Sequence, residues 1–160
     1  MSESTPTGVG VLLSNLGTPA APTAAALRPY LREFLSDRRV VDVPRPIWWL
    51  VLNAFILPFR PGRVAKAYQE IWTEKGSPLL AIGLEQRDGL RALLGASMPV
   101  ELGMRYGSPS IASALEALVG AGCSRILHLP LYPQYAGATV ATNHDAFFAA
   151  VSFGRSMVEA

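Results

Sequence analysis

Residues 129–139 read LPLYPQYAGAT, an apolar strand that runs into a constrained loop. Two tyrosines, Tyr132 and Tyr135, stand among prolines and Gly137. Proline fixes the backbone angle φ and glycine permits positive φ, so we expect a stiff loop that presents aromatic and amide groups. The pattern is equally consistent with a proline-rich turn that only closes a core strand.

The chain around this loop alternates between strand-like and helix-like segments. Apolar periodicity predicts strands at 8–16, 100–106 and 125–129, and helices at 23–36, 60–74, 79–94, 111–119 and 142–151. Thr23 is a candidate cap for the first helix, and Ser108 or Ser110 for the fourth. Strands that alternate with helices pair in parallel through right-handed crossovers. The sequence therefore predicts one α/β domain over residues 8–151, built as a doubly wound, Rossmann-like parallel sheet.

The composition narrows the class of protein. Half of the 160 residues are apolar and 16% are charged, against about 25% in a typical soluble domain. This shortage of charge predicts a surface that is covered by a partner, a membrane or a further domain. The net charge of +2 and the absence of a dense Lys/Arg run argue against nucleic-acid binding.

The single cysteine and the N-terminal residues bear on the compartment. Cys123 has no partner for an intrachain disulfide or a Cys-rich metal site, which favours a reducing cytoplasm. The start, MSESTPTG, lacks the basic residues and apolar core of a signal peptide. We expect residues 1–7 to be disordered.

Residues 47–59, IWWLVLNAFILPF, are the most apolar stretch of the sequence. Thirteen residues are too few to span a bilayer, which takes about 20. One interpretation is a hydrophobic lip at a pocket or membrane surface, and the other is a buried helix. The low total charge favours the lip.

Three expected strand ends carry unusual loops, and ligands of such sheets bind beyond the carboxyl ends of the strands. If the strands are neighbours, Arg105, Tyr106, Gln134 and Tyr135 converge on one crevice. An arginine, two tyrosines and an amide between apolar walls suit a flat aromatic ligand with acidic groups. The dinucleotide, phosphate-loop and Gly-x-Ser-x-Gly hydrolase motifs do not occur in the sequence.

The two histidines do not predict a metal site. His128 lies inside the strand at 125–129, where a hydrogen-bonded core histidine is the favoured interpretation. His144 lies near a helix start, where an exposed or capping role is expected, and neither histidine has a second ligand at metal-binding spacing. The pair Arg38 and Arg39, which follows Asp37, is expected to be solvated.

Four motifs in order, GVLLSNLGTP, YQEIW with GSPL, GMRYGSPSI and LYPQYAGAT, resemble the amino-terminal half of ferrochelatase. That family inserts Fe2+ into protoporphyrin IX, both as substrates, at the end of haem synthesis. The resemblance covers about residues 8–150, and residues 152–160 do not resemble the family's continuation. It implies one lobe of a two-lobed chelatase fold, with the porphyrin between the lobes and no tightly bound cofactor.

The resemblance also implies roles for residues. The positions matching the family's porphyrin-binding residues are Leu16, Arg60, Ser77, Arg105, Tyr106, Gln134 and Tyr135. Arg60 and Ser77 match positions that contact the propionates, and residues 47–59 match a lip that touches the membrane in some members. The family's metal-handling histidine and its partner glutamate lie in the second lobe, beyond residue 160. No catalytic residue is therefore expected within this chain.

Alternatives of different classes remain open at this point. One is a ferrochelatase of which this chain is the first lobe, active only together with the second lobe in a cytoplasmic, membrane-associated enzyme. Another is a non-catalytic porphyrin-binding or interaction module that keeps the first lobe only. Under either hypothesis, a single lobe exposes the face meant for its partner, so self-association through that face is expected. The related cobalt-inserting chelatases share the fold but less of the LYPQY motif.

Overall fold

In the computed structural model, residues 8–158 are described, with side chains up to residue 152. The segment 1–7, which was expected to be disordered, lies outside the described residues. Strand β1 (Gly8–Thr18) forms the centre of a parallel sheet, between β2 (Val100–Gly107) and β3 (Cys123–Pro130). The register aligns Leu13 with Leu102 on one side and with Leu129 on the other. The expected α/β architecture with a parallel sheet is confirmed, and its strand order is β2-β1-β3.

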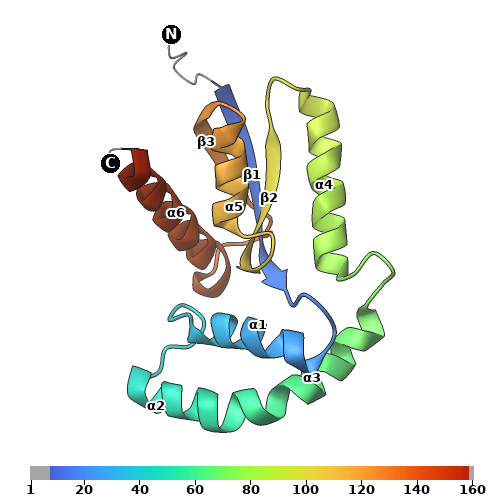
Figure 1. Cartoon of the computed structure of the whole chain (residues 1–160), viewed down its shortest axis with the longest axis vertical. Helices are drawn as coiled ribbons and strands as arrows, with labels where there is room; N and C mark the ends of the chain where they lie inside the picture. The colour runs from blue at the N-terminus through green and yellow to red at the C-terminus, as the bar shows by residue number, and fades with distance from the viewer. Residues whose placement is uncertain (1–7, 159–160) are drawn as a thin grey trace.

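Helices cover both faces of this sheet (Figure 1). Helix α4 (Pro78–Leu94) packs on the face that carries Val11, Leu13 and Leu102. Helices α5 (Ile111–Gly120) and α6 (Thr142–Val158) lie on the opposite face, where Leu12, Leu118 and Cys123 form a second apolar cluster. Successive residues of a strand point to opposite faces, so a buried central strand needs apolar side chains at consecutive positions. The run VLL in β1 meets this requirement.

Residues 24–71 form a helical arm that crosses the carboxyl end of the sheet. Helix α1 (Ala24–Ser36) lies between the sheet and a long curved segment (Figure 1). That segment is made of α2 (Arg45–Val51), a π-helical turn η1 (Leu52–Ile56) and α3 (Leu57–Ile71). The buried leucines Leu27, Leu31, Leu52 and Leu57 join the arm into a third apolar cluster.

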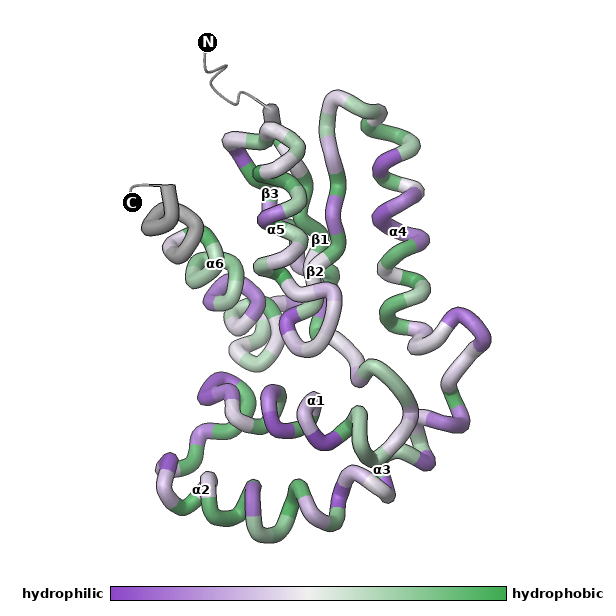
Figure 2. Tube along the Cα trace, viewed as in Figure 1, coloured by the Kyte–Doolittle hydropathy of each residue, from purple (hydrophilic) through white to green (hydrophobic). Residues whose placement is uncertain are grey.

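The apolar stretch 47–59 combines features of both interpretations that the sequence left open. Leu52 and Leu57 are buried in the arm, each 3% exposed. The large side chains that face outward are Ile47, Trp49, Leu50, Phe55 and Phe59. Figure 2 shows hydrophobic residues, in green, along much of the segment from α2 to the start of α3. Among residues 8–158, no helix combines the length and the apolar character needed to cross a membrane.

Most predicted element boundaries agree with the structure to within a few residues. Thr23 caps α1 by accepting a hydrogen bond from the Ala26 amide at 3.3 Å, and Ser110 caps α5 by accepting one from the Ser113 amide at 3.0 Å. The last helix, α6, begins at Thr142 as expected but continues to Val158, and a π-helical turn, η2 (Gly137–Ala141), precedes it. The helix expected at 60–74 begins three residues earlier, at Leu57, and accommodates Pro61 in its first turns.

Candidate functional site

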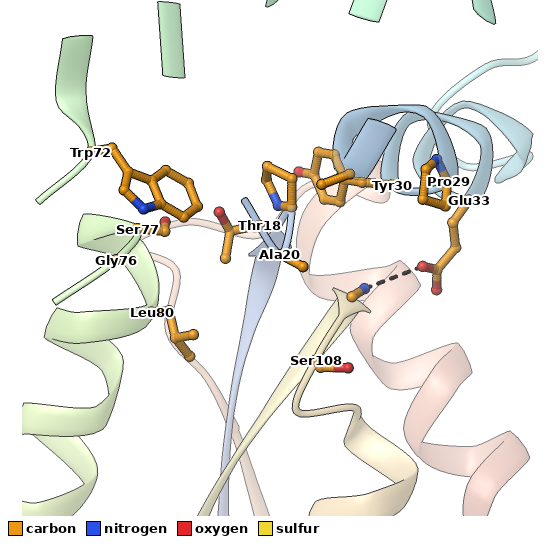
Figure 3. Close-up of a pocket in the computed structure, with 13 residues that line it drawn as sticks. Thr18, Ala20, Pro29, Tyr30, Glu33, Trp72, Gly76, Ser77, Leu80 and Ser108 are labelled. Carbon is orange, nitrogen blue, oxygen red and sulfur yellow. Dashed lines mark hydrogen bonds between the residues drawn. The ribbon is translucent and has the colours of Figure 1, made fainter. Parts of the chain in front are cut away.

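A pocket of about 260 Å³ lies at the carboxyl ends of β1 and β2. Its walls come from the end of β1, helix α1, the α3–α4 connection and the turn after β2. The residues are Thr18, Pro19, Ala20, Ala26, Pro29, Tyr30, Glu33, Trp72, Gly76, Ser77, Leu80, Gly107 and Ser108. Figure 3 shows Thr18 and Ser77 towards one end, near the Trp72 ring, and Glu33 at the other end. Ligands of open α/β sheets bind at this edge.

Of the residues that the sequence placed in a site, Ser77 lines this pocket. Ser77 is 4% exposed and occupies the N-cap position of α4, but its side chain makes no capping hydrogen bond. At the other end of the pocket, the Glu33 carboxylate accepts a hydrogen bond from the Gly107 amide at 3.2 Å. The pocket is therefore mostly apolar, with the hydroxyls of Thr18 and Ser77 at one end and the Glu33 carboxylate at the other, where Ser108 also lies.

Arg105 and Tyr106 belong to a different group, which is centred on Asp37 at the end of α1. One oxygen of Asp37, Oδ2, accepts hydrogen bonds from Arg105 Nη2 at 2.7 Å and from the Tyr106 hydroxyl at 2.8 Å. The Thr142 hydroxyl donates to the same oxygen and accepts from Arg105 Nε at 2.7 Å. This network joins α1, β2 and α6 at the sheet edge.

The network determines the protonation of its members. Burial by itself would raise the pKa of Asp37, but hydrogen bonds from Thr142, the Arg39 amide and Tyr106, with the charge of Arg105, lower that pKa overall. Burial raises the pKa of the Tyr106 hydroxyl, which therefore stays protonated as a donor. Asp37 thus carries a negative charge that Arg105 neutralises.

Tyr106 has no exposed surface, and its ring packs edge-on against Phe34 with centroids 5.2 Å apart. Tyr106 cannot touch a ligand in this conformation, so its geometry suits a structural role, in which it supports Asp37 and Phe34. The Arg105 guanidinium carbon lies 4.5 Å above the Tyr106 ring and its side chain is 21% exposed. Arg105 is the member of the pair that retains access to solvent.

The loop after β3, which carries Gln134 and Tyr135, lies only partly beside Arg105 and Tyr106. Because β1 lies between β2 and β3, the two strand ends are not direct neighbours, which was the condition for the expected crevice. The loop is held to α6, where Asn143 Nδ2 donates to the Tyr132 hydroxyl at 3.2 Å. Gln134 and Tyr135 are exposed, Tyr135 by 72%, and Tyr135 lies within electrostatic reach of Arg39.

The remaining two expected contacts lie on the arm side of the molecule. Leu16, on β1, is half-buried against the apolar cluster of α1, α2 and α3. Arg60, in the first turn of α3, is exposed. Neither residue lines the pocket that contains Ser77.

The histidines form a pair that the sequence did not predict. His128 Nε2 lies 2.8 Å from the buried Ser14 hydroxyl, and its Nδ1 lies 3.2 Å from Nδ1 of His144. The His128 ring also stacks on Phe147, with centroids 4.5 Å apart. His144 therefore contacts the strand from α6 and does not act as a cap. Within the described residues, no group of three or more His, Cys, Asp or Glu side chains could hold a metal ion.

Sequence reasoning missed three residues of this region. Asp37 looked like part of a solvated polar turn, Thr142 carried no motif, and Thr18 lies within the motif GVLLSNLGTP but was assigned no role. Arg38 and Arg39 are exposed as expected, but Arg39 forms an ion pair with Asp145 of α6. The available signal was positional, because Thr18 and Thr142 lie at the end of a strand and at the start of a helix, where sites of α/β sheets form.

Comparison with known proteins gives one consistent result. Residues 8–160 match the sequence profile of the family described as Ferrochelatase. The ferrochelatase of Thioalkalivibrio sulfidiphilus is 57% identical over 141 residues, or 86% of this chain and 38% of that protein. The ferrochelatase of Nitrosococcus oceani is 51% identical over 94% of this chain and 42% of that protein, and that of Methylobacillus flagellatus is 52% identical over 96% and 46%. The chain therefore spans less than half the length of these relatives.

Proposed function

The chain belongs to the ferrochelatase family, and we propose that it forms one wall of a cleft that binds protoporphyrin IX for the insertion of Fe2+. The observation that carries this proposal is the pocket at the carboxyl ends of β1 and β2. Its volume of about 260 Å³ is too small for a tetrapyrrole but suits one acidic side chain of a large, flat ligand. The macrocycle itself would then lie outside the pocket, over neighbouring exposed surface.

Several groups around the pocket support such a wall. Ser77 offers a hydroxyl to an acidic group, and Arg60 offers positive charge at the surface. Arg105, whose charge is paired with Asp37, keeps a partly exposed guanidinium group. Gln134 and Tyr135 provide an amide and an aromatic ring on a loop that prolines keep stiff. Leu16 adds apolar surface from β1. Tyr106 contributes from behind, by holding Asp37 and thereby Arg105 in place.

We assign metal insertion itself to residues outside the part of the relatives that this chain matches. Taking protons from pyrrole nitrogens requires a positioned base, and delivering a metal requires open ligands. The described histidines instead contact each other and Ser14. We therefore expect the 160-residue chain, by itself, to bind porphyrin without inserting iron or zinc.

The exposed apolar side chains of α2 and η1 support a second part of the proposal, contact with a membrane surface. Trp49 and Phe55 are 66% and 63% exposed, and Arg45 and Arg60 are exposed on the same helical arm. Apolar and aromatic side chains bordered by arginines suit an anionic lipid interface. Peripheral contact needs no membrane-spanning helix.

Fluorescence quenching of protoporphyrin IX by the purified chain tests porphyrin binding. We expect saturable quenching that Tyr135→Ala weakens about tenfold, because one stacking surface is lost. Phe148→Ala is a matched control, since Phe148 is 61% exposed on α6 and has no place in the proposed wall. Equal binding by wild type and Tyr135→Ala would remove Tyr135 from the site. Absence of binding, or measurable metal insertion by the chain alone, would overturn the proposal as stated.

A further inference from the structure

The Thr18 hydroxyl is buried without a hydrogen-bond partner. Thr18 is 4% exposed, and Thr18 Oγ1 is one of two buried side-chain polar atoms that lack a partner among the described residues. Leaving a buried hydroxyl unpaired costs free energy, because its hydrogen bonds to water are lost on folding. Such a group is a candidate for an interaction that a ligand completes.

Thr18 lines the pocket described above, at the same end as Ser77. It is the last residue of β1, and the figure places its side chain near Ser77 and the Trp72 ring (Figure 3). Ser77 is equally buried, at 4% exposed. Two hydroxyl groups from separate elements, β1 and the start of α4, thus face the same end of an apolar pocket.

The start of α4 adds an electrostatic preference. The first hydrogen bond of this 17-residue helix runs from the Ala81 amide to the Ser77 carbonyl, at 2.9 Å. The amides of Leu79 and Leu80 precede that bond, Pro78 has no amide proton, and no acidic residue lies in the first turn. Free amides and the helix dipole favour an anion at such a helix end.

The opposite end of the pocket has the opposite preference. The Glu33 carboxylate lies there, bound to the Gly107 amide at 3.2 Å. A negative group would be repelled at this end and attracted at the end that holds Thr18 and Ser77. The pocket is therefore polarised, and an acidic ligand group has one preferred position in it.

We propose that Thr18 is a carboxylate-recognising residue, whose hydroxyl donates to an acidic ligand group held between Ser77 and the first amides of α4. This inference rests on the proposed function, in which that group is a propionate of the porphyrin. Thr18 would then distinguish porphyrins with free carboxylates from those without. A hydrogen bond to a charged group in an apolar pocket contributes more than one between neutral groups.

The test compares protoporphyrin IX with its dimethyl ester, which has the same ring but no free carboxylate. Both are titrated by fluorescence, in one detergent-containing buffer, against wild type, Thr18→Val and Thr18→Ser. Valine keeps the shape of threonine without the hydroxyl, and serine keeps the hydroxyl. We expect Thr18→Val to weaken binding of the free acid about tenfold, or about 1.4 kcal/mol, and to leave binding of the ester unchanged. Thr18→Ser should restore most of the preference.

Thermal unfolding of the ligand-free variants provides a second measurement. Because the hydroxyl has no partner in the folded chain, Thr18→Val should unfold at the same temperature as wild type or higher. A lower unfolding temperature would show that the hydroxyl supports the fold, and would count against the proposal. Equal weakening of acid and ester would likewise overturn it.

If wild type binds neither porphyrin, the proposed function fails and the subsite is tested separately. Sodium propionate is then titrated while the amide signals of residues 18 and 79–81 are followed by NMR. Saturable shifts in wild type that vanish in Thr18→Val would support the subsite without the porphyrin. No shifts, or the same shifts in both proteins, would overturn it.

Discussion

Arg105 and Asp37, which are 68 positions apart in the chain, meet with 2.7 Å between Nη2 and Oδ2. Asp37 is the C-cap residue of α1, and Arg105 lies near the end of β2. Thr142, the first residue of α6, bonds to both of them. The elements α1, β2 and α6 are thus fixed to one carboxylate, and β2 carries the proposed contact Arg105, so Asp37 is expected to position Arg105 without touching a ligand.

We expect Asp37→Asn to lower the free energy of unfolding by about 2 kcal/mol at neutral pH, because it leaves the Arg105 charge without its partner. Asp42→Asn, which changes an exposed carboxylate in the following loop, should alter stability by less than about 0.5 kcal/mol. Urea unfolding monitored by circular dichroism measures both. Equal effects of the two variants would show that the Asp37 network contributes nothing specific.

The pH dependence of this effect follows from the lowered pKa of Asp37. A carboxyl group whose pKa is lower in the folded chain stabilises it at pH values above its unfolded pKa, about 3.9. That contribution disappears as the pH falls through the folded-state pKa. The stability difference between wild type and Asp37→Asn should therefore be constant from pH 7 to about pH 5 and shrink at lower pH.

We expect His128 to cause a second pH dependence of the free energy of unfolding, at higher pH than that of Asp37. Burial, together with the nearby His144, lowers the pKa of His128 to about 4. Between pH 6.5 and 4 the unfolded chain takes up a proton on this residue and the folded chain does not, so stability falls as the pH falls. After allowance for solvent screening, the loss should be about 2 kcal/mol. The titratable group that faces His128 is His144 on α6, and Ser14 faces it from β1.

His128→Gln tests this expectation, because glutamine can still bond to Ser14 but does not titrate. Thermal unfolding between pH 7 and 4 should show a shallower decline for the variant than for wild type. Parallel curves would mean that another group causes the acid sensitivity.

The sheet and its helices could be predicted from local patterns. Alternating apolar residues define β2, the run VLL identifies a central strand, and Thr23 and Ser110 act as caps. The strand order could not be predicted, because no local pattern tells which strands adjoin β1. That order separates the ends of β2 and β3, which the expected crevice required to be neighbours.

Local patterns were also insufficient to predict the environments of individual site residues. Ser77 follows a glycine and precedes a proline, and it lies between two helices that the apolar periodicity predicted, at 60–74 and 79–94. Asp37 stands beside two arginines and looks like solvated surface, while its partners in the structure lie 68 to 105 positions away. The resemblance assigned Tyr106 and Tyr135 the same role, but Tyr106 is buried against Phe34 and Asp37 whereas Tyr135 is exposed. Such differences depend on tertiary packing.

Gly17 is expected to be the most sensitive glycine of the site region. Its φ is +110°, and a Cβ there would lie 1.8 Å from the Tyr106 carbonyl oxygen. Gly17→Ala should therefore lower stability by more than about 3 kcal/mol, through backbone strain and displacement of β2. Gly122→Ala is the matched control, because its φ is +84° but a Cβ there would meet nothing within 4 Å.

The control isolates the cost of backbone conformation, which is about 1–2 kcal/mol. Chemical unfolding of both variants gives the comparison. A similar loss in the two proteins would mean that the contact with Tyr106 relaxes at little cost, and that β1 and β2 are less tightly fixed at their ends than the geometry indicates.

Two residues in the first turn of α3, Leu57 and Phe59, allow the contribution of burial to be tested separately from that of the exposed surface. Leu57 is 3% exposed and Phe59 is 75% exposed. Leu57→Ala should lower the free energy of unfolding by about 2–4 kcal/mol, because it opens a cavity in the cluster of α1, α2 and α3. Phe59→Ser should change the free energy of unfolding by less than about 0.5 kcal/mol.

If the outward side chains of the arm contact lipid, Phe59→Ser should nevertheless reduce co-sedimentation with vesicles of mixed neutral and anionic phospholipids. Loss of vesicle binding without loss of stability would assign the exposed side chains to the membrane surface, whereas unchanged binding would remove Phe59 from it.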